Sequence, residues 1–426
     1  MAGNRKRMNA GAAARTRAKE ALKRARELRE ADAFEPPVQT GSVVDVVSVK
    51  ADMRASRRKA LLAGAGCLVA LIVVALVGLC MPFSNLEHAL GAYSPSDALA
   101  YWWTKIYTDI GGIFSMEISS RAARTWVEFA AAHPNVDTAG LALRGKVTLV
   151  VIACGCMLAV SGLLFQSTFR NPIATPSLLG VSDGVTLGSV LFVMTGNYSL
   201  SQDSSLYFLL VYGCGALVVL VVVLSGRFIS GRRSNVVDML LAGTVIAQLV
   251  GGVNTYVTNF VLNQDAWGAF YEMQQAYDSL TQDITYWLVG VFFVVTVIPA
   301  VLLSFRLNLV SFDDGEVRLS GAHPVALRAL ALVLGAAMQL AAMASIGQVA
   351  MLGLVIPFLT RYILPSDFRW QLLGNCLLGS AVLLLCVNAQ SLFTFGIVSM
   401  PIGTIVGVLV IPLLVWVIAL QRKGWE

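Results

Sequence analysis

Ten apolar stretches, separated by shorter polar or glycine-rich segments, run through residues 61–420 of this chain. Each is close to the ~20 apolar residues that a helix needs to cross the hydrocarbon core of a bilayer. The pattern predicts an all-α, polytopic membrane protein with about ten transmembrane helices. The expected spans are residues 61–81, 147–166, 176–195, 206–226, 237–262, 284–305, 325–344, 347–364, 371–391 and 402–420.

The composition supports a membrane domain. Hydrophobic residues make up 57% of the chain, charged residues make up 13%, and the mean hydropathy is +0.72. A typical soluble domain has about 25% charged residues. The sequence therefore excludes an ordinary soluble protein.

Basic residues predict the orientation of the spans, because Lys and Arg accumulate in cytoplasmic loops. The loops at 196–205 and 263–283 contain no Lys or Arg, so they are expected outside the cytoplasm, as is the long mixed loop at 82–146. Both termini, including the tail at 421–426, are then cytoplasmic. The basic residues on the cytoplasmic side are Arg170, Arg227, Arg232, Arg233, Arg306, Arg318, Arg328, Arg361, Arg369, Arg422 and Lys423.

The first 60 residues form a basic cytoplasmic tail. They hold 15 Lys and Arg against 7 Asp and Glu, a net charge of +8. Strong helix formers with few apolar residues indicate a solvated helix or a disordered segment. The cluster at 54–59 either attracts anionic membrane lipid or only sets the topology of the first span. No aromatic or recognition motif supports nucleic-acid binding.

A polar break interrupts two apolar spans within residues 155–188. It contains Gln166, Arg170, Asn171 and Pro172. Proline has no backbone donor and disfavours helix at the residue before it. Irregular backbone between membrane spans is stable only where protein or a water-filled cavity satisfies it. The break therefore indicates a transport pathway or a partner at this hinge.

Motifs for catalysis are missing from the sequence. It contains no GxxxxGK[ST] loop, no HExxH and only three histidines, which lie in loops, so we expect no catalytic residues, no metal site and no bound cofactor. The GxSxG match at 180–184 lies in an apolar span without a histidine base and is attributed to chance. Ionisable residues near the spans are few, with Asp183 and Asp238 as candidates for ion coupling.

Uncharged polar residues inside the fifth span form a second candidate site. Gln248, Thr255 and Asn259 are spaced by 7 and 4 residues, so they share one helical face. This face either lines a polar route or bonds to a neighbouring helix, and the sequence leaves both open.

The ordered residues across the polar break are similar to a family signature. They resemble FecCD-type permeases, the membrane subunits of bacterial ABC importers for iron–siderophore, haem and cobalamin. Residues 241–243, 347–361 and 401–407 resemble three further blocks of the family, in the right order. The residues that match the signature are Ser161, Gly162, Gln166, Arg170, Asn171, Pro172, Ala174, Pro176, Leu179 and Gly180.

The chain departs from the family pattern at several positions. Gln348 replaces a usual proline, Phe358 a usual histidine, and Asp183 a usually small residue. These departures indicate a divergent branch, so the substrate does not follow from the resemblance.

The resemblance implies that two permeases, either two copies or two sister chains, pair about a central path. Separate ABC ATPase subunits would dock below and use ATP and Mg²⁺. Coupling would pass through the loop between the sixth and seventh helices, and the hinge would hold helix ends together at the cytoplasmic side. The residues of this loop that match the family are Leu307, Asn308, Ser311, Arg318 and Gly321.

On the outer side, the resemblance implies basic residues that dock an extracytoplasmic solute-binding protein. Arg144 matches one family arginine, and Lys146 lies beside the position of a second. The alternative is that both residues anchor the second span at the membrane interface.

Together these observations predict a non-enzymatic permease of an ATP-driven importer in the bacterial cytoplasmic membrane. Its substrate would be an iron–siderophore, haem or cobalamin-type chelate. One alternative is an ion- or proton-coupled secondary transporter, which would need Asp183 and Asp238. A membrane anchor is the other alternative, and an anchor would not need four ordered family blocks.

Overall fold

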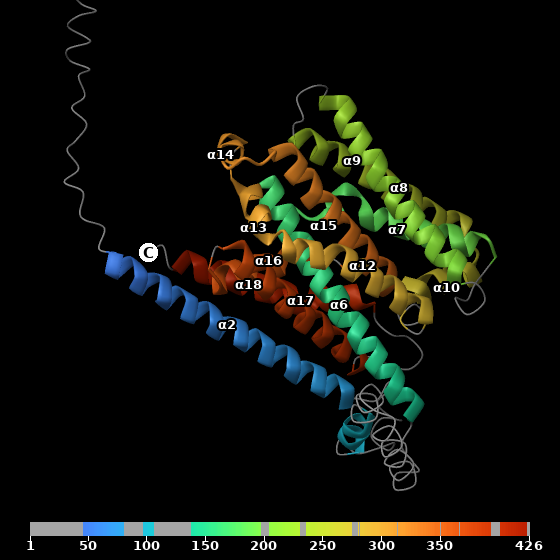
Figure 1. Cartoon of the computed structure of the whole chain (residues 1–426). Helices are drawn as coiled ribbons and strands as arrows, with labels where there is room; N and C mark the ends of the chain where they lie inside the picture. Colours follow the sequence, from blue (N-terminus) through green and yellow to red (C-terminus); the bar gives the residue numbers. More distant parts are fainter. Residues whose placement is uncertain are drawn as a thin grey trace, which may run out of the picture. The chain divides into compact units, whose positions relative to one another are not determined.

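The computed structural model of the chain is built from helices (Figure 1). The chain divides into two units, residues 1–58 and 59–426. Most of the basic tail at 1–60, most of the loop at 82–146 and the end of the tail at 421–426 lie outside the described residues. The structure describes residues 46–80, 97–105, 138–196, 204–230, 236–274, 280, 282–312, 314–349, 351–365, 367–392 and 401–423.

All the regular structure in these ranges is helical, which confirms the predicted all-α class. The long helices are α2 (Val46–Cys80), α6 (Thr138–Phe169), α8 (Ser204–Ser230), α9 (Val236–Tyr256), α12 (Asp283–Leu302), α15 (Pro324–Ile346), α17 (Phe368–Leu392) and α18 (Ile402–Lys423). The shorter helices are η1 (Pro176–Leu179), α7 (Val181–Met194), η2 (Val257–Val261), α10 (Gln264–Gln274), α13 (Ser304–Leu307), η3 (Asn308–Ser311), α14 (Asp314–Leu319) and α16 (Leu352–Ile363).

Every predicted span falls on one of these helices, but two of the helices are shorter than predicted. Six helices in the described part are long and apolar enough to cross a membrane. The helices α7 and α16 have 14 and 12 residues, or ~21 and ~18 Å, against a hydrocarbon core of ~30 Å. Left-handed backbone at Gly180, Gly347 and Met351 shortens them, because regular α-helix cannot continue through it.

Helix α6 forms the centre of the membrane unit. It contacts α12, α15, α16 and α17, and 83% of its most apolar stretch is buried (Figure 1). Glycines allow the closest of these contacts. A Cβ atom on Gly155 would lie 2.6 Å from the Gly379 carbonyl oxygen, and one on Gly162 would overlap the carbonyl oxygen of Gly353. The backbones of α6, α16 and α17 therefore touch directly, the usual geometry of small residues between membrane helices.

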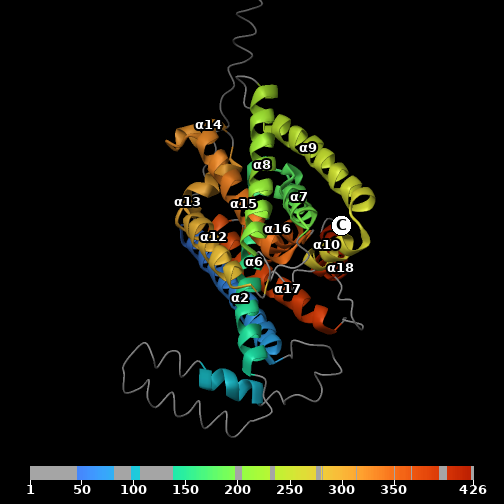
Figure 2. The ribbon, with the colours of Figure 1, turned by 90° about the vertical axis from the view of Figure 1, so that its right-hand side faces the viewer.

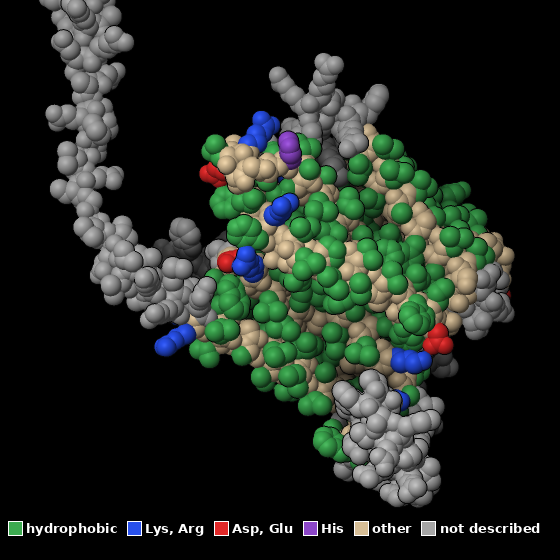
Figure 3. Space-filling view, viewed as in Figure 1, with side chains coloured by type: hydrophobic (Ala, Val, Ile, Leu, Met, Phe, Trp, Pro, Cys, Tyr) green, Lys and Arg blue, Asp and Glu red, His purple; other side chains and the backbone are tan. Residues whose placement is uncertain are grey.

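Helices α7, α8 and α9 pack together on one side of α15 (Figure 2). Glycines again set the spacing, since a Cβ atom on Gly188 would lie 2.6 Å from the carbonyl oxygen of Leu210. Hydrophobic side chains cover most of the face shown in Figure 3, and the charged ones lie toward its edges. This distribution suits a surface in contact with lipid.

We predict that Gly162→Ala destabilises the protein strongly. The added methyl group would overlap the Gly353 carbonyl oxygen on a neighbouring helix, and overpacking of this kind costs about 3 kcal/mol. Thermal unfolding of the purified protein in detergent measures the effect.

Gly213→Ala is the matched control, because Gly213 in α8 has no atom within 4 Å of an added Cβ. Its stability should be unchanged, or higher by up to ~1 kcal/mol from helix propensity. Equal unfolding temperatures for the two variants would contradict the packing derived for α6.

Candidate functional site

The hinge motif ends α6 in a defined turn. Arg170 has a left-handed φ of 49°, and the Asn171 amide donates to the Gln166 carbonyl at 3.2 Å. This bond spans the last turn as in a Schellman cap. The Asn171 side-chain oxygen then accepts a hydrogen bond from the Ile173 backbone amide at 3.0 Å. Pro172 prevents the helix from resuming. The polar break predicted from sequence is therefore a helix terminus with its own hydrogen bonds.

Polar side chains of α6 also connect it to neighbouring elements. The amide of Gln166 donates to the Leu354 carbonyl at the start of α16, at 3.0 Å. Gln339 of α15 accepts from Ser161 of α6 and donates to Ser177 of η1, both at 3.2 Å. These buried bonds satisfy polar groups within the membrane unit and fix the helix ends beside the hinge.

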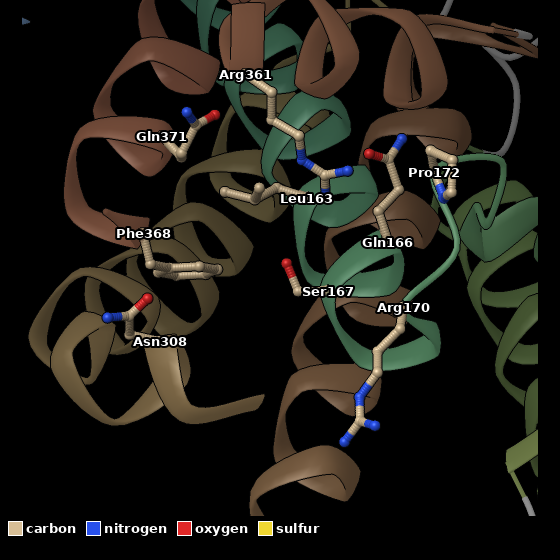
Figure 4. Close-up of a pocket in the computed structure, with 9 residues that line it drawn as sticks. All are labelled: Leu163, Gln166, Ser167, Arg170, Pro172, Asn308, Arg361, Phe368 and Gln371. Atoms are coloured by element: carbon tan, nitrogen blue, oxygen red, sulfur yellow. The ribbon is translucent and has the colours of Figure 1, made fainter. Parts of the chain in front are cut away.

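The structure brings the hinge and the predicted coupling loop together. The Arg170 guanidinium donates to the carbonyl of Phe312, directly after η3. A cavity of about 380 Å³ opens beside this contact (Figure 4). In the figure, Arg361 extends from α16 toward Leu163 and Gln166 on α6. The cavity is lined by Leu163, Gln166, Ser167, Arg170, Pro172, Asn308, Arg361, Phe368 and Gln371.

This cavity combines two arginines with four uncharged polar side chains, and no carboxylate is among the described residues that line it. Gln371 is held in place by hydrogen bonds to backbone carbonyls, including that of Pro365 at 2.8 Å. The cavity residues of α17 lie outside every motif read from the sequence. Only the folded chain brings Phe368 and Gln371 next to the hinge.

The predicted coupling loop is anchored at two points and exposed between them. Leu307 and Val317 are buried, whereas Arg318 is exposed and Leu319 is 91% exposed. Gly321 has a left-handed φ of 79°, and its amide donates to the Arg318 carbonyl at 3.0 Å, which ends α14. No motif in the sequence marks Leu319, and its exposure is visible only in the folded chain.

Two further positions of this loop complete the comparison with the sequence. Asn308 lines the cavity, and Ser311 ends η3 with its side chain outside the described atoms. Gly315 lies inside the short helix α14.

The polar face predicted on α9 is exposed. Gln248, Thr255 and Asn259 are all exposed, while the neighbouring Asn254 is buried against α7. Thr255 bonds to its own helix, at the Gly251 carbonyl 2.8 Å away. The residue that bonds to a neighbouring helix is thus Asn254, whose amide donates to the Asp183 carbonyl at 2.9 Å.

The two basic residues considered for docking have different surroundings. Arg144 is 3% exposed, and its guanidinium donates to the Gly78 carbonyl and to Asn388, both at 2.9 Å. It therefore holds the C-terminal end of α2 against α6 and α17, where a cation suits the helix dipole. Lys146 is exposed on the surface and forms an ion pair with Asp283 at 3.1 Å.

No group of three or more His, Cys, Asp and Glu side chains in the described part of the chain could hold a metal ion. The candidate site thus consists of the junction between the hinge and the predicted coupling loop, and of an exposed polar face on α9 and η2.

Known proteins similar to this chain are transport permeases. The sequence matches the FecCD transport family over residues 108–420. The haemin permease HmuU of Yersinia pestis is 32% identical over 281 residues, 65% of this chain and 81% of the relative. The iron-uptake permease FeuB of Bacillus subtilis is 29% identical over 64% of this chain and 78% of its own length. The vitamin B12 permease BtuC of Citrobacter koseri is 28% identical over 65% of this chain and 81% of its own length.

A solved structure described as an inward-facing metal-chelate type ABC transporter has the same fold. The TM-score is 0.64 at 20% identity, with 84% of this chain and 99% of that chain covered. The family match covers most of the chain, and it includes both the hinge and the coupling loop. The chain therefore belongs to the FecCD transport family and is an integral membrane permease subunit of an ABC importer, whose ATPase is a separate subunit.

Proposed function

We propose that this permease imports a metal chelate of the iron–siderophore, haem or cobalamin type. The observation that carries the proposal is the junction at the cytoplasmic end of α6, where hinge and coupling loop share one cavity. Movement of the loop by a partner would reach α6 through Arg170, Asn308 and Arg361. The names of the relatives support the substrate class, since they refer to haemin transport, iron uptake and vitamin B12 import.

The partners follow from the exposed surfaces. ABC ATPase subunits would dock on the loop that presents Arg318 and Leu319. A second permease, either a copy or a sister chain, would cover α9, so that Gln248, Thr255 and Asn259 line a central path. A polar face exposed to lipid would be unfavourable, and a water-filled path between two permeases removes this penalty.

An extracytoplasmic solute-binding protein would deliver the chelate. The position of Arg144 gives it a role inside the chain, so Lys146 is the remaining docking candidate of the two. Its partner Asp283 is also exposed, and the pair lies at the N-terminal end of α12.

The proposed function is tested by purifying the chain with its ATPase and measuring ATP hydrolysis with and without the loaded binding protein. We expect a stable complex whose hydrolysis rises when the loaded binding protein is added. A chain that binds no ATPase would contradict the proposal and favour the ion-coupled transporter.

Arg318→Glu should uncouple transport from hydrolysis. The reversal replaces an exposed cation of α14 with a carboxylate, so the ATPase contact weakens while the buried anchors Leu307 and Val317 remain. We expect assembly of the permease pair to persist while uptake falls about tenfold, as for loss of one charged interface contact. Lys59→Glu, at an exposed position of α2 outside the coupling loop, is the control. Unchanged uptake and unchanged stimulated hydrolysis in Arg318→Glu would contradict a coupling role for Arg318.

Lys146→Glu should slow docking of the binding protein, most strongly at low ionic strength. Charges at the rim of an interface act mainly on the association rate, and salt screens them. Stopped-flow association at two salt concentrations measures the effect, with Lys105→Glu in the short helix at 97–105 as a control. A change that does not depend on salt would argue for a structural defect in the variant.

A further inference from the structure

Asp183 is the only charged residue of α7, and it lies beside an interior position of α9. The segment formed by η1 and α7 runs alongside α9. A Cβ atom on Gly243 would lie 2.7 Å from the Leu178 carbonyl oxygen, and one on Gly251 would lie 3.1 Å from Asp183 Oδ1. Gly251 follows the first residue of α9 by about 15 residues, or ~22 Å along the helix. An ionisable side chain so placed in a membrane domain points to a function.

The surroundings of Asp183 have unused hydrogen-bonding capacity. Asp183 is partly exposed, and Gly251 provides the space beside its carboxylate. Asn254 is 6% exposed, and its side-chain amide nitrogen donates a hydrogen bond to the Asp183 backbone carbonyl. Its Oδ1 atom is buried and has no hydrogen-bond partner among the described residues. An acceptor without a donor is costly when buried, so the surroundings of the carboxylate carry unmet polarity and, in the described part of the chain, no positive charge that would neutralise it.

The carboxylate lies next to the polar edge of α9. Residues spaced by 4, 3, 4 and 3 fall on one edge of a helix, and here they are polar or glycine. The other exposed edge is apolar and suits lipid. The polar edge consists of Thr244, Gln248, Gly251, Thr255 and Thr258, and the apolar edge of Val245, Leu249, Val253 and Tyr256.

The hydroxyl groups of this polar edge already donate hydrogen bonds within the chain. Thr244, Thr255 and Thr258 each donate to a carbonyl of their own helix, at 2.9, 2.8 and 2.7 Å. The strongest groups left to meet a passing solute are therefore the Asp183 carboxylate and the side-chain amides of Gln248 and Asn259.

The charge of Asp183 has no counterpart on the helices that carry the path, since α7 and α9 contain no Lys or Arg. One turn further along α7, Thr186 accepts a hydrogen bond from Gln348. Asp183 and Gln348 are two of the positions where the chain departs from the family pattern, and both act on this part of α7. Their combination makes the path negative and locally more polar.

We infer that Asp183 sets the charge preference of the transport path. It favours chelates that carry an ammonium group or a net positive charge over chelates of the same size with a free carboxylate. The inference rests on the proposed function, because it assumes that a chelate passes along α9.

The test uses the permease with its ATPase and binding protein in liposomes. The probes are two ferric trihydroxamate chelates that differ only in an ammonium or a carboxylate substituent. We expect ATP-dependent uptake to favour the ammonium chelate by at least tenfold. One charge contact about 10 Å apart in a medium of effective dielectric ~20 is worth roughly tenfold, and the carboxylate chelate is repelled where the ammonium chelate is attracted. Asp183→Asn should abolish most of this preference, and Asp183→Glu should keep it.

Asp265→Asn is the matched control, since Asp265 also lies in the first turn of a helix, α10, but is exposed outside the path. Unfolding temperatures of all variants separate selectivity from stability. Uptake by the unchanged chain with no charge preference, or a preference that survives in Asp183→Asn, would overturn the inference alone. No ATP-dependent uptake of either chelate by the unchanged chain would contradict the proposed function itself.

Discussion

Direct backbone contact between α6 and its neighbours is the constraint on which the other features depend. Lipid tails are as apolar as leucine, so membrane helices gain little from the hydrophobic effect and rely on close packing. Gly155 and Gly162 bring α6 against Gly379 of α17 and Gly353 of α16. This contact fixes the position of α6 relative to α16 and α17. The hinge and the cavity beside it are positioned by the same packing.

The short helices α7 and α16 show how irregular backbone is accommodated around this core. Each starts after left-handed residues, which leave polar groups that the hydrocarbon core cannot satisfy. Polar side chains of the core helices lie close to these breaks: Gln166 of α6 donates to the Leu354 carbonyl of α16, and Gln339 of α15 donates to the Ser177 hydroxyl of η1. Such breaks place polar groups and helix termini inside the membrane unit, as transporters require for a path. The fold and the proposed path thus have a common origin in the interrupted helices.

Much of this was readable from the sequence, because apolar length and the order of motifs are local signals. The helices, the hinge at Arg170 and Asn171 and the exposed loop around Arg318 follow from them. Contacts between distant segments gave no such signal. The buried position of Arg144 depends on Gly78 and Asn388, which are 66 and 244 residues away. The pairing of Asp183 with Gly251 likewise depends on the register between α7 and α9. The lengths of α7 and α16 could not be predicted from the sequence, since a glycine or methionine does not by itself indicate a left-handed backbone conformation.

The central claim is that this chain forms the path of an importer that ATP drives. Its most direct test is uptake of labelled iron chelate, haem and cobalamin into liposomes that contain the permease, its ATPase and the binding protein. We predict uptake of one of these chelates only when ATP is available to the ATPase, with no response to an imposed proton or sodium gradient. Uptake that follows an ion gradient without ATP would contradict the claim.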